Sequence, residues 1–505
     1  MVRAARMTTP KAAKRRDATG VPAEIRNWID GRECAASSGE WFDKLDPDRG
    51  IRLYRVARSK TDDVRLAVQS AKQAQGAWAE MTPVKRGEIL HSIAQALHDH
   101  RQTLARVVAA ETGKSPSSAL TETDGAIALG RFMAGEGQRF YGRTTTSGTP
   151  NRYAMTIRQP LGVAGLIIAA NTPIANVAWK VFPALICGNA AVLKAAEDAP
   201  ASAWIFATIA HDAGLPAGVL NVVQGSGPEA GVPLVADHDV QVISFTGSTA
   251  VGREIAVAAG RRLARVSLEL GGKNPFVVCD DAELERAAHW ALQSAFSNAG
   301  QRCASGSRLI IFETVYERFR ALLMERVKRM QVGPTDADDF GPVINEEQLT
   351  AMLRAVERAR ARGAKILTGG YRLTDPKHRQ GFYMAPTLIE GADPHDEIST
   401  TELFGPIACL YRVKDFAEAL ALADDSPYGL TACIHTRSLD RAMAFVQKVQ
   451  AGVAVVNAGT FGSEPHMPFG GVKQSGNGTR EPGTEALDIY SNLKDVYLTT
   501  DPTHV

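Results

Sequence analysis

The sequence predicts an α/β fold of two or three domains, in which helices alternate with the strands of parallel sheets. A chain of 505 residues exceeds the size at which a single hydrophobic core stops growing. Apolar residues make up 45% and charged residues 22%, which is ordinary for a globular protein and excludes a disordered or coiled-coil class. From Met155 onwards, short apolar runs alternate with amphipathic helical segments, which is typical of repeated βαβ units.

The first 150 residues divide into a tail, a ribbon and a set of helices. Residues 1–20 hold six basic residues against one acid, Asp17. That composition suits a transit peptide, but we interpret it as a disordered, solvated tail. From Asn27 to about Val56, alternation of apolar and polar residues around Asp-Gly, Ser-Gly and Asp-Pro predicts short antiparallel strands. Helical patterns follow between residues 61 and 112 and at about 117–135.

Residues 151–272 are predicted to form a domain of the nucleotide-binding type. Strands are expected at 163–169, 190–194, 219–223, 240–245 and 265–270, and helices near 174–187, 200–213, 228–236 and 250–259. Open parallel sheets bind ligands at the carboxyl ends of their strands. Asn171, Lys194, Gly247 and Glu269 each stand at or just after such an end, so we expect them to converge on one crevice.

Residues 273–455 are predicted to form a second α/β unit. Its strands are expected at 275–279, 309–312, 408–413, 431–435 and 452–456, and its helices near 284–297, 314–330, 346–361, 415–424 and 438–449. The closing segment 495–500, DVYLTT, resembles an edge strand without a place in its own sheet. Pairing with the early ribbon or with another subunit would satisfy its backbone groups.

Charge and cysteine usage exclude several functions. Lys and Arg total 57 against 55 for Asp and Glu, so nothing indicates a nucleic-acid partner. The longest apolar run near the middle, Leu161–Ala170, has ten residues, far fewer than the roughly twenty that cross a bilayer, so no membrane partner is expected. The six cysteines form no C-x-x-C pair and have no histidines at zinc spacing, which predicts no metal site and a reduced, cytoplasmic setting.

Cys303 is the candidate nucleophile. A lone cysteine is often only a small buried hydrophobe. Here it lies in NAGQRCASGSR, residues 298–308, a polar loop with two glycines after a predicted helix. Backbone N–H groups of such a loop create the electropositive, accessible surroundings that a reactive thiolate needs.

Glu269 and Asn171 are further candidates, each with a structural alternative. Glu269 ends an apolar strand among leucines, where it is either paired structurally or desolvated into a general base. Asn171 follows the strand GVAGLIIAA and precedes Thr172-Pro173. Its amide is either a turn or N-cap residue or a donor to an oxyanion.

Two glycine-bearing segments are candidates for phosphate binding. Residues 245–252, FTGSTAVG, combine a strand, a glycine turn and a helix start, which directs free N–H groups at an anion. Residues 225–230 fit G-x-G-x-x-A after a strand. Pro228 and the lack of a clearly placed ribose-binding acid make this second segment a weak dinucleotide fingerprint.

The motifs together resemble those of the aldehyde dehydrogenase superfamily over roughly residues 28–500. LELGGKNP around Glu269 and GQRC around Cys303 resemble its two active-site signatures. FTGSTAVG, LKAAE, ELFGP and MPFGGVKQSG resemble its cofactor and structural motifs, in the same order.

The resemblance implies a cysteine-based oxidation of an aldehyde to an acid with NAD. Cys303 attacks the carbonyl, and the Asn171 amide and the Cys303 N–H hold the oxyanion. Hydride leaves for the nicotinamide, and Glu269 activates the water that hydrolyses the thioester. Lys180, Arg480 and Glu481 match positions used for proton relay, although an extra residue in GNGTRE blurs the match of the last two.

The resemblance also assigns the cofactor-binding residues. Lys194 and Glu197 are implied to grip the adenosine ribose, and Glu402 the nicotinamide ribose. A carboxylate at Glu197 repels a 2′-phosphate, which favours NAD while leaving NADP possible. The full implied set is Lys194, Glu197, Gly227, Phe245, Gly247, Ser248, Gly252, Leu270, Glu402 and Phe404.

Departures from the family pattern bear on the substrate. The family often has P-W-N-F-P where this chain reads AANTP at 169–173. This chain also has Asn176 at a position where many relatives have an apolar residue that lines the substrate tunnel. With Glu464 and His466, these changes indicate a tunnel for a polar aldehyde, such as the oxo-acid semialdehyde 2,5-dioxopentanoate. Arg302 either helps to bind a substrate carboxylate or packs against the adjacent domain.

The resemblance predicts a parallel-sheet dinucleotide-binding domain, an α/β catalytic domain and a small β-ribbon oligomerisation domain, in a homodimer or homotetramer. Residues 21–150 are expected to contribute to the first and third of these. Residues 151–272 form the dinucleotide-binding domain and 273–455 the catalytic domain, and 456–505 return to the first domain and supply the oligomerisation strand. The alternatives are a coenzyme-A-acylating relative, against which Glu269 argues, and a non-catalytic protein that retains the fold.

Overall fold

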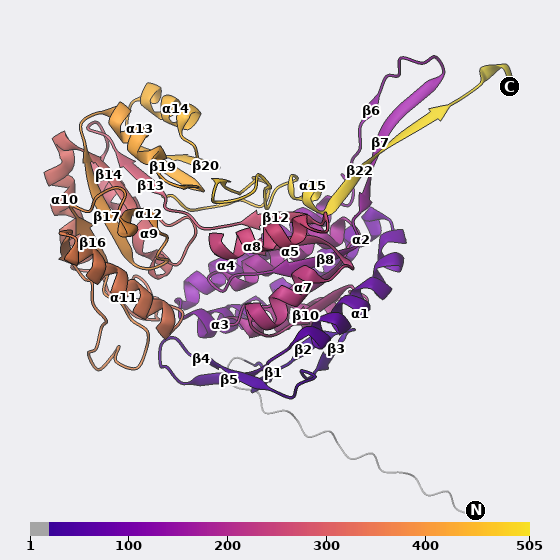
Figure 1. Ribbon diagram of the computed structural model, residues 1–505, viewed down its shortest axis with the longest axis horizontal. Coiled ribbons are helices and arrows are strands. Elements are labelled where there is room, and N and C mark those ends of the chain that lie inside the picture. The colour runs from indigo at the N-terminus through magenta and orange to yellow at the C-terminus, as the bar shows by residue number, and fades with distance from the viewer. Residues whose placement is uncertain (1–19, 505) are drawn as a thin grey trace, which may run out of the picture.

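The computed structural model describes residues 20–504 and consists of two α/β units side by side, with a narrow sheet projecting from one of them (Figure 1). The predicted disordered tail lies outside the described residues, apart from Gly20. The projecting sheet carries the C-terminal strand well away from both units.

The first unit is built on a seven-stranded sheet with the order β12-β11-β8-β9-β10-β2-β3. Its parallel strands are β8 (Val163–Ile167), β9 (Ala190–Lys194), β10 (Leu220–Val223), β11 (Val240–Thr246) and β12 (Arg265–Glu269). The antiparallel edge is formed by β2 (Asn27–Ile29) and β3 (Arg32–Cys34). The five predicted apolar strands of this unit are therefore confirmed.

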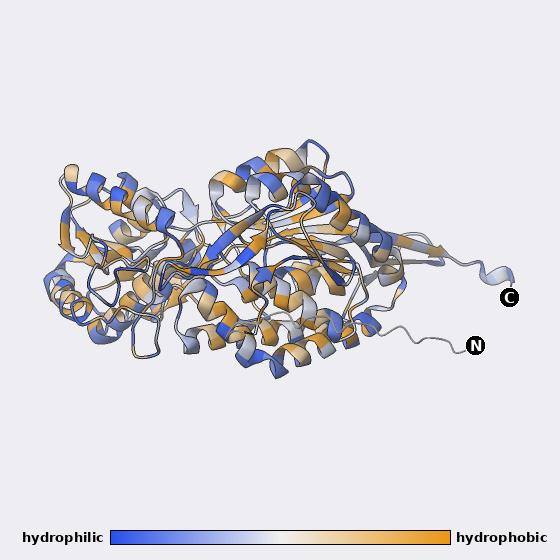
Figure 2. Cartoon of the chain, turned by 90° about the horizontal axis from the view of Figure 1, so that it is seen from below, coloured by the Kyte–Doolittle hydropathy of each residue, from blue (hydrophilic) through white to orange (hydrophobic). Residues whose placement is uncertain are grey.

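Helices cover both faces of the first sheet, which is why its strands are continuously apolar. Along β9, Val192 packs into a cluster with Val64 and Val68, whereas Leu193 faces the opposite cluster. One layer holds α1 (Thr61–Glu80), α7 (Val232–Ala236) and α8 (Thr249–Gly260), with the π-helical turn η1 (Gly227–Gly231). The other holds α2 (Pro83–Asp99), α3 (Arg101–Thr112), α4 (Pro116–Gly135), α5 (Pro173–Ile186) and α6 (Pro200–Asp212). Figure 2 shows the apolar strands enclosed between helices with polar outer faces.

The strands of the early ribbon belong to two different sheets. Only β2 and β3 join the first sheet. A separate three-stranded sheet contains β1 (Glu24–Ile25), β4 (Trp41–Leu45) and β5 (Arg52–Ala57). The prediction of short antiparallel strands holds for β4 and β5, while β1 pairs with β5 in parallel.

The second unit is built on a seven-stranded sheet with the order β15-β16-β17-β14-β13-β19-β20. Its strands are β13 (Pro275–Val278), β14 (Arg308–Phe312), β15 (Lys365–Thr368), β16 (Thr387–Glu390), β17 (Ile407–Val413), β19 (Thr431–His435) and β20 (Val453–Val456). Its helices are α9 (Leu284–Phe296), α10 (Glu313–Val327), α11 (Glu346–Ala361), α12 (Glu397–Thr400), α13 (Phe416–Asp424) and α14 (Leu439–Lys448). Strands β15 and β16 were not among the predicted elements.

The projecting sheet consists of β22 (Ser491–Thr499), β7 (Arg152–Pro160) and β6 (Thr144–Thr145). β22 pairs with β7 along its whole length, from Ser491 opposite Pro160 to Thr499 opposite Arg152. The closing strand was expected to pair with the early ribbon or with another subunit. Pairing with the early ribbon is wrong, whereas pairing with another subunit stays a prediction. Since β7 belongs to this sheet, we propose that the dinucleotide-binding domain begins near residue 161 rather than at 151.

Candidate active site

Asn171 lies in the turn between β8 and α5, at the carboxyl end of the first sheet. Pro173 occupies the first position of α5, where its fixed φ angle and missing N–H suit a helix start. Asn171 Nδ2 donates to the Gln301 carbonyl at 3.1 Å, and Asn298 Nδ2 donates to the Asn171 carbonyl at 3.4 Å. An amide NH₂ has two N–H groups, so one remains for an oxygen atom in the cavity that Asn171 lines.

The loop that carries Cys303, here called the cysteine loop, turns sharply after α9. Asn298, Ala299 and Gly300 have φ angles of 54°, 54° and 68°, all in the left-handed region. For alanine this region costs roughly 1–2 kcal/mol, so the surrounding contacts must hold Ala299 there. A Cβ atom on Gly300 would lie 2.1 Å from the Gly405 carbonyl oxygen, so only glycine fits. This turn directs Cys303 into the same cavity as Asn171.

The segment after β12 holds the backbone of the cysteine loop. Asn274 Nδ2 donates to the carbonyls of Cys303 and Ser305 at 2.7 and 2.9 Å. A Cβ atom on Gly272 would lie 2.4 Å from the Cys303 carbonyl oxygen, so glycine is required for this close approach. The Gly-Gly pair of LELGGKNP therefore lets the end of β12 pack directly against the candidate nucleophile.

The residue Cys303 is partly exposed, but its thiol lies in an environment that disfavours the charged form. Burial raises the pKa of the thiol to about 12, and the nearby carboxylates of Glu402 and Glu269 act in the same direction. The backbone N–H groups of Ala304 and of Cys303 itself act in the opposite direction. The thiol is thus neutral at physiological pH in this environment, and its activation requires a base or a nearby positive charge.

Glu269 ends β12 and is 5% exposed. Within residues 20–504, neither of its carboxylate oxygens has a hydrogen-bond partner. Burial raises the pKa of Glu269 well above its ordinary value of 4.5, and the Glu481 carboxylate raises it further, against the opposing effects of Lys180 and Arg480. The structural alternative for Glu269, a paired carboxylate, is not what the structure shows, and the group is poised to take up a proton.

Lys180 and Glu481 form a buried ion pair behind Glu269. Lys180 Nζ lies 3.0 Å from Glu481 Oε2, and both side chains are fully buried. Lys180 Nζ also donates to Ser244 Oγ at 2.7 Å, and Ser244 Oγ donates to Glu481 Oε1 at 2.7 Å. The structure therefore brings Glu481 next to Lys180 despite the extra residue in its motif. Arg480 Nη1 donates to the Gly471 and Thr479 carbonyls.

One cavity of about 440 Å³ joins these groups. Of the residues predicted from the sequence, those that line it are Asn171, Gly247, Ser248, Glu269, Leu270, Cys303, Glu402 and Phe404. Those predicted residues that do not line it are Lys180, Lys194, Glu197, Gly227, Phe245 and Gly252. Of the four residues expected to converge from the strand ends, Asn171, Gly247 and Glu269 line this cavity together with Cys303, whereas Lys194 does not.

The residues predicted to grip an adenosine ribose lie at the carboxyl end of β9. Lys194 Nζ is 3.4 Å from Glu197 Oε1, and the Gly227 N–H donates to the same oxygen at 2.6 Å. Burial lowers the pKa of Lys194, and Glu197 partly restores it. Lys194 is 4% exposed, whereas Glu197 is 47% exposed and accessible to a ligand. The Gly227 N–H is occupied by Glu197, so this glycine positions the carboxylate.

The helix α8 begins beside the cavity. Ser248 caps it by accepting from the Val251 N–H, and Gly247 and Ser248 line the cavity at this helix N-terminus. Phe245 and Gly252 pack beneath this turn: a Cβ atom on Gly247 would meet the Phe245 ring at 2.4 Å, and one on Gly252 would meet Leu270 at 2.5 Å. A helix N-terminus with a glycine turn is suited to a phosphate group.

Glu402 lies on the other side of the cavity, close to Cys303. Its Oε1 accepts from the Gly272 N–H at 3.0 Å. Burial raises the pKa of Glu402 to about 7, and the Gly272 N–H and Lys273 act against that shift. Phe404, two residues later, has a φ angle of 57°, an uncommon conformation for an aromatic residue. Such strain is consistent with a segment shaped around a ligand.

Comparisons with known proteins show the family of this chain. The model of the aldehyde dehydrogenase family matches residues 34–496. This chain belongs to the aldehyde dehydrogenase family. The alpha-ketoglutaric semialdehyde dehydrogenase of Bacillus subtilis (strain 168) is 38% identical over 477 residues, which cover 94% of this chain and 97% of that protein.

Solved structures of other aldehyde dehydrogenases have the same fold. The crystal structure of betaine aldehyde dehydrogenase from Staphylococcus aureus in complex with NAD⁺ has a TM-score of 0.92 at 30% identity, covering 95% of each chain. A putative aldehyde dehydrogenase from Burkholderia cenocepacia has a TM-score of 0.92 at 34% identity, covering 94% of this chain and 98% of the other. The present chain is accordingly an aldehyde-oxidising enzyme that acts through a catalytic cysteine.

The wall of the aldehyde dehydrogenase cavity next to Asn171 contains both polar and aromatic residues. Thr172 and Asn176 line it, and Asn176 Nδ2 donates to the Thr172 carbonyl and hydroxyl at 3.0 and 2.9 Å. Trp179 and Phe469 also line the cavity and contact each other edge to face at 5.4 Å between ring centroids. Trp179 shares a helix face with Thr172 and Asn176, a spacing by which the sequence could have revealed it.

Arg302 does not line the cavity of this dehydrogenase. Its guanidinium carbon lies 4.5 Å from the centroid of the Phe461 ring, which is a cation–π contact. This geometry favours the packing alternative for Arg302.

Sequence reasoning also missed Asp198, which lines the cavity and accepts from Asn345 Nδ2 at 2.8 Å. Asp198 directly follows Glu197 in the chain, but Asn345 is too distant for any local pattern to predict.

Metal ligands and membrane-spanning helices were not expected from the sequence. Within residues 20–504, no group of three His, Cys, Asp or Glu side chains is arranged to hold a metal ion. In the same part of the dehydrogenase, no helix combines the length and the apolar character required to cross a bilayer.

Proposed function

We propose that this protein oxidises a small, polar oxo-acid semialdehyde to the corresponding carboxylic acid with NAD, through a covalent intermediate on Cys303. The observation that carries the proposal is the meeting of Cys303, Asn171 and Glu269 around one cavity. These three side chains supply a nucleophile, an oxyanion donor and a base that has no hydrogen-bond partner among the described residues.

The residues around the cavity fit NAD. Gly247 and Ser248 line the cavity at the N-terminus of α8, whose positive dipole end suits a pyrophosphate, while Lys194 and Glu197 offer a cation and a carboxylate to the adenosine ribose. Glu402 lies beside Cys303, where a carboxylate can accept from the nicotinamide ribose. When bound, NAD supplies the carbon that accepts hydride from the substrate.

Addition begins with loss of the Cys303 proton. Glu269, with its raised pKa and two unpartnered oxygens, is suited to take up that proton. The sulfur then forms a bond to the aldehyde carbon, and the carbonyl π electrons move to oxygen. The free N–H of the Asn171 amide and the Cys303 backbone N–H donate to this oxyanion, which stabilises it more than they stabilise the neutral carbonyl. Re-formation of the carbonyl with loss of hydride leaves a thioester on Cys303.

Hydrolysis completes the reaction. Glu269 removes a proton from water as the water oxygen bonds to the thioester carbon, and breaking the carbon–sulfur bond releases the acid and regenerates the cysteine. We propose that Lys180 and Glu481, buried behind Glu269, carry the proton taken from Cys303 onward to solvent before hydrolysis, so that Glu269 is ionised when water attacks. The proton that Glu269 then takes from water passes to the departing Cys303 sulfur. An unpartnered carboxylate at the water-activating position is also the feature that distinguishes hydrolysis from transfer of the acyl group to coenzyme A.

We propose that the cofactor is NAD rather than NADP. Glu197 is half-exposed, and its Oε1 is already fixed by Lys194 and the Gly227 N–H. A carboxylate held in this way accepts from ribose hydroxyls and repels a 2′-phosphate. The betaine aldehyde dehydrogenase of Staphylococcus aureus was solved with NAD⁺, which supports the same choice.

Polar residues in the cavity support an oxo-acid substrate. Thr172 and Asn176 occupy positions where an apolar wall would suit an alkyl chain. Both Asn176 N–H groups are directed to Thr172, so its carbonyl oxygen is left for a polar group in the cavity. The alpha-ketoglutaric semialdehyde dehydrogenase of Bacillus subtilis is 38% identical to this chain, which supports an oxo-acid of the 2,5-dioxopentanoate type.

We propose that the protein works as a homodimer or homotetramer assembled through the projecting sheet. β22 is an edge strand of that sheet. Apolar side chains on β7 and β22 are exposed, namely Tyr153, Ile157, Leu493, Tyr497 and Leu498. Exposed edges and apolar surfaces of this kind are normally covered by a partner, here a second copy of the chain.

We propose that the protein works in the cytoplasm, because its six cysteines are free thiols, which persist in a reducing compartment.

Turnover assays with a panel of aldehydes test this function. Purified protein with NAD should form NADH from 2,5-dioxopentanoate with a kcat/KM about 10-fold or more above that for an alkyl aldehyde of similar length, because unpaired polar groups in the cavity penalise the alkyl chain. Asn176→Leu should narrow that ratio. A preference for alkyl aldehydes would refute the oxo-acid proposal, and turnover by Cys303→Ala would refute the nucleophile.

A further inference from the structure

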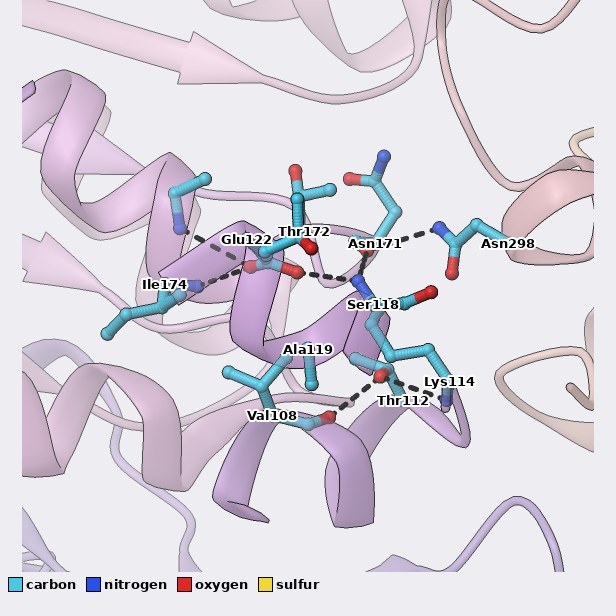
Figure 3. A network of polar contacts seen from close by, with 12 residues as sticks. Val108, Thr112, Lys114, Ser118, Ala119, Glu122, Asn171, Thr172, Ile174 and Asn298 are labelled. Carbon is cyan, nitrogen blue, oxygen red and sulfur yellow. Dashed lines mark hydrogen bonds and ion pairs between the residues drawn. The ribbon is translucent and has the colours of Figure 1, made fainter. Parts of the chain in front are cut away.

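A buried ion pair lies directly beneath the turn that carries Asn171 (Figure 3). Lys114, just after α3, and Glu122, on α4, are joined by a contact of 2.5 Å between Nζ and Oε2. Their side chains are only 5% and 6% exposed. Neither residue belongs to a segment that the sequence marks as functional, and neither lines the cavity.

The pair binds both ends of the Asn171 turn. Lys114 Nζ donates to the Asn171 carbonyl at 2.8 Å. Glu122 Oε1 accepts from the N–H groups of Ile174 and Ala175 at 3.0 and 3.4 Å. These are the second and third residues of α5, and the Thr172 side chain does not cap them. Glu122, which lies on the neighbouring helix α4, therefore accepts the hydrogen bonds that the side chain of an N-cap residue would otherwise accept.

The replacement leaves the Thr172 hydroxyl free for another role. That hydroxyl accepts from Asn176 Nδ2 on the cavity wall instead of from the helix N–H groups. An ordinary N-cap would draw the Thr172 side chain back onto α5 and change the wall. The ion pair thus makes the observed arrangement of Thr172 and Asn176 compatible with a stable helix start.

On its other side the same turn contacts the cysteine loop. Asn171 Nδ2 and Asn298 Nδ2 both donate to the Gln301 carbonyl at 3.1 Å, and Gln301 stands two residues before Cys303. Two sets of contacts consequently fix the position of the Asn171 amide relative to the nucleophile. Lys114 and Glu122 hold the backbone of the turn, and the cysteine loop accepts a hydrogen bond from the amide itself.

We propose that Lys114 and Glu122 are positioning residues that hold the Asn171 amide at the oxyanion site. The inference rests on the role of Asn171 in the proposed function. A buried ion pair is weak evidence for stability alone, because desolvation offsets much of its attraction. Its three contacts to one turn instead give the rigidity that oxyanion stabilisation requires, since donors must be in place before charge develops.

Single-turnover formation of NADH separates positioning from general damage. Glu122→Gln keeps the size of the side chain but removes the ion pair, and Lys114→Met removes the donor to Asn171. Each should slow NADH formation by about 10- to 100-fold, the range expected when a catalytic group is misplaced by roughly 1 Å. The KM for NAD should stay unchanged in both variants.

Alkylation of Cys303 by iodoacetamide provides the second readout. This reaction needs the thiolate but develops no oxyanion, so both variants should react at the wild-type rate. Equal slowing of alkylation and NADH formation would overturn the proposal, because it would indicate a disrupted cysteine loop. Asp281→Asn is the matched control: Asp281 likewise accepts from two backbone N–H groups at a helix start and pairs with a cation, Arg441. It lies outside the cavity, so NADH formation should be unaffected.

A double-mutant cycle with Asn171→Ala tests whether the pair acts through Asn171. If it does, adding Glu122→Gln to Asn171→Ala should cause little further slowing. Full multiplicative slowing in the double variant would overturn the proposal, as would a Glu122→Gln enzyme with the wild-type rate. If Asn171→Ala alone kept the wild-type rate, the oxyanion role in the proposed function would fail instead.

Discussion

Glu269 illustrates how the proposed chemistry conflicts with stability at a single residue. A buried carboxylate normally has hydrogen-bond partners, yet both oxygens of Glu269 lack one within the described part of the chain. Burial and Glu481 raise its pKa well above 4.5. In the folded protein its ionisation is therefore costly, and that same cost makes the carboxylate a strong base toward a thiol or a water molecule in the cavity.

Glu269→Gln should slow both halves of the reaction and stop the second. The amide cannot take up the proton of the Cys303 thiol, so addition should depend on the small ionised fraction of the thiol, and it cannot remove a proton from water, so hydrolysis should stop after the first turnover. With saturating NAD and aldehyde we expect at most one equivalent of NADH per active site, formed more slowly than in the wild type, and a thioester on Cys303 that intact-mass measurement detects. Continuous turnover at the wild-type rate would disprove the base assignment, and Cys303→Ala provides the control that forms no adduct.

The same substitution should also stabilise the protein in a pH-dependent way. Because the folded-state pKa of Glu269 is raised, its contribution to stability is present below the unfolded value of 4.5 and is lost as pH rises through the folded value. Glutamine stays neutral, so the unfolding free energy of the variant should exceed that of the wild type above this range, by about 1–3 kcal/mol. Thermal unfolding from pH 4.5 to 8 measures the difference. A constant difference over that range would contradict the assigned cause.

Local sequence predicts the residues of the candidate site better than it predicts their support. Asn171, Glu269 and Cys303 each stand at a strand end or in a polar loop, so local patterns are sufficient to single them out. Lys114 stands between two predicted helices and Glu122 lies within the second of them, and neither is next to a strand end or a recognised motif. Their importance arises only when α4 packs against the start of α5, which no local pattern encodes.

Among the strands, those with a clear local pattern were predicted, whereas those that depend on distant partners were not. The strands β8 to β12 are buried on both faces, so their continuous apolar runs predict them. β15 and β16 read KILT and TLIE, four residues each, and β15 is only half-buried at the sheet edge. Such short, mixed runs carry no clear period. Pairing of β22 with the early ribbon was also wrongly predicted, because its actual partner, β7, precedes it by more than 300 residues.

Cofactor choice belongs to the connection between β9 and α6. Glu197→Ser removes the carboxylate that faces the expected position of the 2′-hydroxyl and leaves Lys194 without its partner. The kcat/KM ratio of NADP to NAD should rise by about 10-fold or more, since one removed charge repulsion is worth roughly 1–2 kcal/mol at such a site. Steady-state kinetics with both cofactors measure it. Glu254→Ser, exposed on α8, is the control, and an unchanged ratio in Glu197→Ser would exclude Glu197 as the discriminating residue.

In the whole molecule, the cavity and the projecting sheet are separate structures. The cavity forms where the two seven-stranded sheets meet, and its lining comes from those two units and the segments that connect them. The projecting sheet extends from the first unit, and none of its described strands lines the cavity (Figure 1). Assembly and chemistry should therefore respond to different substitutions.

Charged substitutions on β22 should dissociate the oligomer. Leu493 and Tyr497 are 58% and 60% exposed and lie on the same face of β22, four residues apart. Leu493→Lys with Tyr497→Lys would place two like charges on the apolar face, and the desolvation cost should shift the mass toward the monomer. Light scattering after size-exclusion chromatography measures that mass. Lys494→Glu, on the opposite face of the same strand, should leave it unchanged. An intact oligomer in the double variant would show that subunits associate through another surface.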